Sequence, residues 1–77
     1  MMEPTPLTPD RVRADVADVL GLDPGAVADD LQLTDQGMDS IRLMTLVERW
    51  RADGADIDLV DLAERPTIAQ WLALLTP

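Results

Sequence analysis

Apolar residues recur at helical spacing in three stretches of this 77-residue chain, at residues 9–20, 41–53 and 68–75. Residues three, four, seven and eight apart share one face of an α-helix. Each stretch therefore predicts an amphipathic helix that buries one apolar stripe. The three stripes comprise Val12, Val16, Val19 and Leu20; Leu43, Leu46, Val47 and Trp50; and Ile68, Trp71, Leu72 and Leu75.

Helix start and stop signals bound these stretches. A side-chain oxygen just before a helix can accept a hydrogen bond from an unpaired amide, and a glycine just after a helix readily adopts the left-handed turn that ends it. A further start signal at Asp58 predicts a short fourth helix over residues 59–64, ended by Arg65-Pro66. The expected N-caps are Thr8, Asp39, Asp58 and Thr67, the last in a capping box with Gln70, and the expected stops are Gly21 and Gly54.

Residues 22–38 show no sustained helical period, and this connection is longer than most. Asp23-Pro24 favours a short helical turn within it. We expect the apolar residues of the loop to anchor it on the core and its acidic residues to face water. The expected anchors are Leu22, Val27, Leu31 and Leu33, and the expected solvated acids are Asp29, Asp30 and Asp35.

These elements predict an all-α fold, a small four-helix bundle with three main helices and one short helix. We expect residues 8–77 to form a single domain. Residues 1–7 contain Pro4 and Pro6, which do not easily join a helix, and are expected to form a flexible N-terminal arm.

Composition excludes several classes of function. With no cysteine, histidine or lysine, the chain lacks disulfides, thiolate metal ligands and the usual catalytic bases. Its net charge of −9 argues against binding to nucleic acid or to anionic membranes. Asp56 and Asp58 begin a calcium-loop pattern, but its glycine and closing glutamate are missing, so no metal site is expected. We expect a cytoplasmic location, because the sequence shows neither a membrane-spanning apolar run nor a secretion signal.

The stretch Gly37-Met38-Asp39-Ser40 stands at the start of the second predicted helix. The glycine breaks the loop, Asp39 caps the helix, and Ser40, the only serine of the chain, takes the first helical position with an exposed hydroxyl. A helix N-terminus favours anions, so a phosphate ester on Ser40 would be well placed. The simpler alternative is an ordinary capping pair on a surface helix.

Gly37-Met38-Asp39-Ser40 followed by an amphipathic helix resembles the phosphopantetheine attachment site of acyl and peptidyl carrier proteins. The resemblance extends from about Thr8 to Leu75. Arg49-Trp50-Arg51 and the run over residues 56–71 look most like the aryl carrier domains of siderophore-type nonribosomal peptide synthesis. Both tryptophans also have a sufficient explanation as core residues at helical spacing.

The resemblance implies a monomeric carrier protein that performs no catalysis. It implies 4'-phosphopantetheine attached to Ser40 by a phosphopantetheinyl transferase, with Asp39 beside it in the cofactor site. An adenylating enzyme for an aryl acid or an amino acid would load the carrier, and a condensation or other synthetase domain would accept the acyl group. A peptidyl or other non-aryl acyl cargo is one alternative, and a helical adaptor that binds one protein partner is another.

Partners are expected to dock on an apolar face formed by Ile41, Met44, Leu59 and Ala63. Ile41 and Met44 project away from the buried stripe of their helix, and Leu59 and Ala63 lie four apart on the short helix. For Ile41, packing under the long loop is an equal alternative. Acidic and basic residues balance over residues 39–53, unlike the acidic helix of fatty-acid-type carriers, so charge steering by this helix should be weak.

Overall fold

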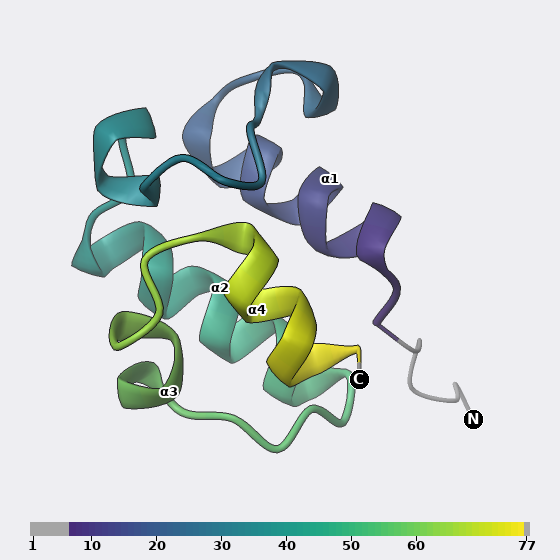
Figure 1. Cartoon of the computed structure of the whole chain (residues 1–77). Helices are drawn as coiled ribbons and strands as arrows, with labels where there is room; N and C mark the ends of the chain where they lie inside the picture. Colours follow the sequence, from purple (N-terminus) through teal and green to yellow (C-terminus); the bar gives the residue numbers. More distant parts are fainter. Residues whose placement is uncertain (1–6, 77) are drawn as a thin grey trace.

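Four α-helices and two short 3₁₀ turns make up the computed structural model, which describes residues 7–76 (Figure 1). The helices are α1 (Pro9–Leu20), α2 (Ser40–Ala52), α3 (Leu59–Ala63) and α4 (Ile68–Leu75), and the turns are η1 (Pro24–Ala26) and η2 (Leu33–Gln36). The described residues contain no strand, and the prediction of a small all-α bundle is confirmed. Of the expected arm, residues 1–6 lie outside the described residues, while Leu7 is half-buried against the core.

Each helix begins at the N-cap that the sequence predicts. The four cap side chains accept a hydrogen bond from the backbone amide three residues ahead, which satisfies one unpaired donor of each first turn. α1 ends at Gly21, whose φ of 71° lies in the left-handed region. The caps are Thr8, Asp39, Asp58 and Thr67.

The reciprocal capping box forms at α3 rather than at α4. The Asp58 carboxylate accepts from the Asp61 amide at 3.1 Å, and the Asp61 carboxylate accepts from the Asp58 amide at 3.0 Å. At α4, the Gln70 side chain accepts from the Thr67 hydroxyl at 3.0 Å instead of from the Thr67 amide. The predicted box at Thr67 is therefore wrong in its second half, because a threonine hydroxyl is a donor as well as an acceptor and engages Gln70 itself.

The three predicted stripes meet in one core. Trp50 and Trp71 are fully buried in it, with ring centroids 6.0 Å apart and ring planes at 85°, the favourable edge-to-face arrangement. The Trp71 indole N–H donates to the carbonyls of Leu62 at 3.1 Å and Arg65 at 2.7 Å, which ties α4 to the end of α3. The other buried apolar residues are Val12, Val16, Ala17, Val27, Leu33, Met38, Leu43, Leu46, Val47, Ile57, Leu62 and Ile68, with Val19, Leu20, Leu72 and Leu75 half-buried around them.

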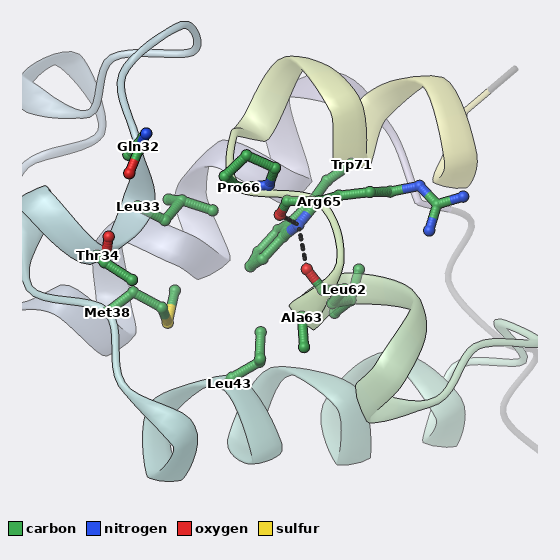
Figure 2. Close-up of a pocket in the computed structure, with 10 residues that line it drawn as sticks. All are labelled: Gln32, Leu33, Thr34, Met38, Leu43, Leu62, Ala63, Arg65, Pro66 and Trp71. Atoms are coloured by element: carbon green, nitrogen blue, oxygen red, sulfur yellow. Dashed lines mark hydrogen bonds between the residues drawn. The ribbon is translucent and has the colours of Figure 1, made fainter.

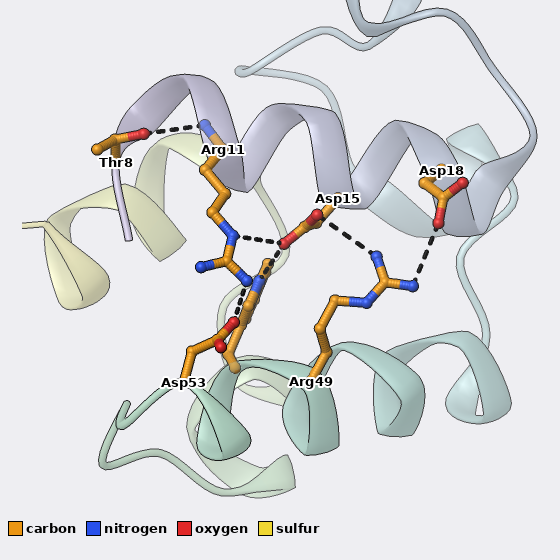
Figure 3. A network of polar contacts seen from close by, with 7 residues as sticks. Thr8, Arg11, Asp15, Asp18, Arg49 and Asp53 are labelled. Carbon is orange, nitrogen blue, oxygen red and sulfur yellow. Dashed lines mark hydrogen bonds and ion pairs between the residues drawn. The ribbon is translucent and has the colours of Figure 1, made fainter. Parts of the chain in front are cut away.

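A seam of polar side chains joins α1 to α2 (Figure 3). The Asp15 carboxylate accepts a 2.8 Å hydrogen bond from the Trp50 indole and lies 3.4 Å from the guanidinium groups of both Arg11 and Arg49. Arg49 also lies 3.2 Å from the Asp18 carboxylate. These contacts hold the C-terminal half of α2 beside α1.

The long loop between α1 and α2 is anchored by fewer apolar residues than predicted. Val27 and Leu33 are buried, but Leu22 and Leu31 are 41% and 56% exposed, so the prediction that these two leucines anchor the loop is wrong. A backbone hydrogen bond of 2.8 Å from the Leu33 amide to the Pro66 carbonyl supplies one of the missing attachments. Backbone pairing with the start of α4 therefore replaces part of the expected apolar packing.

Asp29 is a second correction, because it is ion-paired rather than surrounded by water. Arg13 donates to its carboxylate at 2.9 Å and 2.6 Å, and these hydrogen bonds hold the pKa of the Asp29 carboxyl below its ordinary value. The Asp29 carbonyl also accepts from the Ala69 amide at 3.0 Å. Asp29 thus connects α1, the loop and α4, whereas Asp30 and Asp35 are exposed as predicted.

Candidate functional site

Ser40 is the first residue of α2 and follows the long loop directly. Gly37 ends η2 with a φ of 105°, a value that favours glycine, and Asp39 then adopts the extended backbone of an N-cap. The Ser40 residue is exposed, and its hydroxyl has no hydrogen-bond partner within residues 7–76. The hydroxyl is therefore accessible from solvent, as the sequence predicts.

Asp39 caps α2 and pairs with Arg42 at the same time. Its Oδ1 accepts from the Arg42 amide at 2.9 Å, and its Oδ2 contacts the Arg42 guanidinium. The amide hydrogen bond, followed by the guanidinium charge, holds the pKa of the Asp39 carboxyl below its usual value. Each carboxylate oxygen can accept more than one hydrogen bond, so the half-exposed Asp39 side chain can contact a further group while it caps α2.

Arg42 also reaches the end of α1. Its Nε donates to the Val19 carbonyl at 3.0 Å. α1 has no basic residue in its own last turn, so Arg42 supplies the cation that a helix C-terminus favours. The helix start that bears Ser40 is thereby attached to the end of α1.

Exposed apolar side chains project from α2 and α3, which pack against each other. Ile41 is 80% exposed, which excludes its packing under the long loop, and Met44 is 44% exposed. On α3, Ala63 is exposed and Leu59 is half-buried against the core. The apolar face predicted from the sequence did not include Val60, which is 58% exposed. Its exposure could have been predicted, because a helix of only five residues has more apolar residues here than one face can bury.

An apolar cavity of about 170 Å³ opens between the loop, α2 and α3 (Figure 2). Met38 and Leu43, which flank Ser40 in the sequence, line it, as does Ala63 of α3. Trp71 contributes a further part of its lining. The sequence did not predict this cavity, because the burial of Met38 depends on how the loop folds back. The exposed apolar surface around Ala63 therefore continues into a recess near the start of α2.

The geometry suits covalent attachment of a phosphate ester at Ser40. The exposed hydroxyl needs no rearrangement of the helix to react, and the cap that starts the helix comes from Asp39 instead. Within residues 7–76, no group of three or more acidic, histidine or cysteine side chains could hold a metal ion. None of the helices in this part of the chain is long and apolar enough to cross a membrane.

Residues 10–75 match the profile of a family described as "Phosphopantetheine attachment site". Among curated proteins, the chain is 48% identical over 69 residues to the isochorismatase of Bacillus subtilis, covering 90% of this chain and 22% of that protein. It is 46% identical over 71 residues to the phenyloxazoline synthase MbtB of Mycolicibacterium paratuberculosis, covering 92% of this chain and 6% of that protein.

A third relative has a length close to that of this chain. The acyl carrier protein ScoB of Streptomyces coeruleorubidus is 44% identical over 73 residues, which cover 95% of this chain and 86% of that protein. The chain thus spans a small part of the first two relatives and most of the third. No solved structure matches the chain.

Proposed function

This chain belongs to the phosphopantetheine attachment site family, and from that premise we propose that Ser40 is the residue to which its arm is attached. The chain is a carrier domain, and 4'-phosphopantetheine is its cofactor. The observation that carries the assignment is the Ser40 hydroxyl, which is exposed at the first residue of α2 and belongs to the only serine of the chain.

The chain's own part in loading is to present a nucleophile. A phosphopantetheinyl transferase brings coenzyme A to Ser40, whose oxygen attacks the phosphorus that bears the pantetheine. An O–P bond forms at Ser40, the bond to the second phosphate breaks, and adenosine 3',5'-bisphosphate leaves with the bonding electrons. The hydroxyl proton passes to a base of the transferase, because this chain has no histidine or lysine and the hydrogen bond from the Arg42 amide, which lowers the pKa of the Asp39 carboxyl, makes it a weak base.

Once attached, 4'-phosphopantetheine supplies the terminal thiol that holds an acyl group as a thioester. The chain has no cysteine with which to do this itself. In this proposal the chain is a monomeric, protein-bound substrate of other enzymes rather than an enzyme. The reaction belongs in the cytoplasm, where coenzyme A and the transferase are available.

The proposed cargo is an aryl acid activated by an adenylating enzyme, as in siderophore-type nonribosomal peptide synthesis. Two observations support it. The relative MbtB is named as a phenyloxazoline synthase, and phenyl is an aryl group; residues 49–51 and 56–71 of this chain also resemble aryl carriers. The second candidate is a carrier for a non-aryl acyl group, supported by the relative named acyl carrier protein ScoB. Trp50 and Trp71 do not favour either cargo, because both are buried core residues.

The proposed docking face for a condensation or other synthetase domain consists of Ile41, Met44, Leu59 and Ala63. The exposure of Ile41 and Met44 supports it, because residues three apart on a helix are neighbours and adjacent exposed apolar side chains form the kind of patch that is typical of contact surfaces. The recess beside Ala63 adds apolar surface to this face.

Intact mass after incubation with coenzyme A and a phosphopantetheinyl transferase tests the attachment. We expect the wild-type chain to gain one 4'-phosphopantetheinyl group and Ser40→Ala to gain none, with the fold retained because Asp39 keeps the cap. Thr45→Ala is the matched control, since it removes the next hydroxyl of α2 and should still be modified. A pantetheine mass on Ser40→Ala would contradict the assignment, and an unmodified wild-type chain would favour an adaptor.

Charging of the modified chain distinguishes the two cargo classes. With separate adenylating enzymes and radiolabelled acids, we expect an aryl acid such as salicylate or a dihydroxybenzoate to be transferred in preference to amino acids. Preferential charging by an amino-acid-activating enzyme would contradict the aryl assignment and leave the attachment at Ser40 intact.

A further inference from the structure

Arg42 lies at the junction between the end of α1 and the start of α2. Its guanidinium contacts Asp39, the residue immediately before Ser40, and its Nε donates to the Val19 carbonyl at 3.0 Å. The Arg42 side chain therefore extends back toward the helix start and not along α2. It is 46% exposed, so its guanidinium is accessible from solvent.

The Arg42 guanidinium has more N–H donors than its two described hydrogen bonds use. A guanidinium carries five N–H groups in a planar fork. Nε is used by Val19 and one terminal nitrogen by Asp39, while the second terminal nitrogen has no partner within the described residues 7–76. Because the Val19 carbonyl already orients the guanidinium, Arg42 would lose little side-chain entropy on binding a further acceptor.

Attachment at Ser40 adds a negative charge next to an existing one, the carboxylate of Asp39. A phosphodiester carries one negative charge, and the Asp39 carboxylate lies on the adjacent residue. These two negative charges repel each other, and a nearby cation offsets that repulsion by attracting both. Arg42 is the only basic residue between Gly37 and Glu48, so it is the cation that the first turns of α2 offer.

We propose that Arg42 accommodates the phosphodiester on Ser40, sharing its guanidinium between the Asp39 carboxylate and the phosphodiester oxygens while the Val19 carbonyl holds it in place. The proposal rests on the attachment at Ser40 proposed above. No bond forms or breaks in this pairing. Its consequence is energetic coupling: replacing Arg42 lowers the thermal stability of the modified chain more than that of the unmodified one.

A thermal unfolding cycle measures this coupling on the full chain. Wild type and Arg42→Gln are each melted before and after enzymatic modification, with the intact mass recorded for every sample. We expect modification to lower the Tm of Arg42→Gln by about 2–4 °C more than it lowers that of wild type. The excess should shrink at high salt, and the phosphodiester ³¹P resonance should differ between the two modified chains.

Arg49→Gln is the matched control. Arg49 lies on the same side of α2 two turns later and also contacts α1, at Asp15 and Asp18, but it is remote from Ser40. Its loss should lower the Tm of the modified and unmodified chains equally. Equal shifts for wild type and Arg42→Gln, or as large an excess for Arg49→Gln, would overturn the proposal. An unmodified wild-type mass would instead overturn the attachment on which the proposal rests.

Discussion

The Trp50 indole N–H donates a 2.8 Å hydrogen bond to the Asp15 carboxylate, so a fully buried side chain of α2 depends on one acceptor in α1. Removing that acceptor leaves the indole donor unsatisfied in the core.

Asp15→Ala should therefore reduce the free energy of unfolding by about 1–3 kcal/mol in urea titrations. Asp18→Ala is the control, because it removes one exposed ion pair with Arg49 and should cost no more than about 0.5 kcal/mol. Losses of equal size for the two variants would show that the indole hydrogen bond contributes little.

The depressed pKa of Asp29 predicts a specific loss of stability in acid. A carboxyl whose folded pKa lies below its unfolded value stabilises the fold above the unfolded value, and this contribution is lost as pH falls through the folded pKa. Tm measured below about pH 4 should fall less steeply for Asp29→Asn than for wild type. Asp39, whose pKa is also lowered, keeps part of the slope in the variant. Asp30→Asn should follow the wild-type curve, and an unchanged slope for Asp29→Asn would refute the role of the Arg13 pair.

The two loop leucines separated by one residue should differ sharply on truncation. Leu33 is 3% exposed and Leu31 is 56% exposed. Leu33→Ala should cost about 2–5 kcal/mol of unfolding free energy, because it opens a cavity in the core, and Leu31→Ala should change it by less than about 0.5 kcal/mol. A large loss for Leu31→Ala would restore the anchoring role that the sequence suggests.

Gly37 should resist substitution for conformational reasons alone. Its φ of 105° is rarely adopted by residues with a side chain, although the nearest atom to an added Cβ, Cδ2 of Leu20, is 3.9 Å away. Gly37→Ala should therefore cost about 1–2 kcal/mol in urea unfolding despite the available space. Gly25→Ala is matched to it, because that glycine has open space without a positive φ and its substitution should be close to neutral.

Charges placed on the proposed docking face should impair acyl transfer without unfolding the chain. Met44→Asp and Ala63→Asp should each lower transfer to the downstream domain by about tenfold, because each places a carboxylate that must lose water on docking, at a cost of roughly 1.5 kcal/mol. Ala73→Asp, at an exposed alanine of α4, adds the same charge away from the face and should transfer normally. Transfer that is intact in both variants and falls steeply with salt would indicate electrostatic docking instead.

Helix ends could be predicted from the sequence because a cap is a contact between residues three apart. Thr8, Asp39 and Asp58 therefore start their helices as expected. The exposure of Met44 could also be predicted, since it follows from helical period once the buried stripe is known. That of Ile41 could not be decided from the sequence, because packing under the long loop was an equal alternative. The place of Ser40 as the first residue of α2 follows from these local rules.

Features that require distant partners could not be predicted in this way. The pairing of Asp29 with Arg13 joins residues 16 apart, and that of Trp50 with Asp15 joins residues 35 apart. In the aperiodic loop, nothing local distinguishes a leucine that turns inward from one that turns outward, as Leu31 shows. The contact of Arg42 with α1 likewise depends on how the two helices pack.

The perpendicular pair of buried tryptophans gives the protein an optical reporter of its own. Trp50 and Trp71 are its only aromatic residues, so its near-ultraviolet absorbance and intrinsic fluorescence arise wholly from this pair. One ring comes from α2 and the other from α4, so a shift of either helix changes the optical coupling between them. Trp71 also lines the recess beside Ala63, so a tryptophan-free partner domain that fills this recess is expected to change the fluorescence without any added dye.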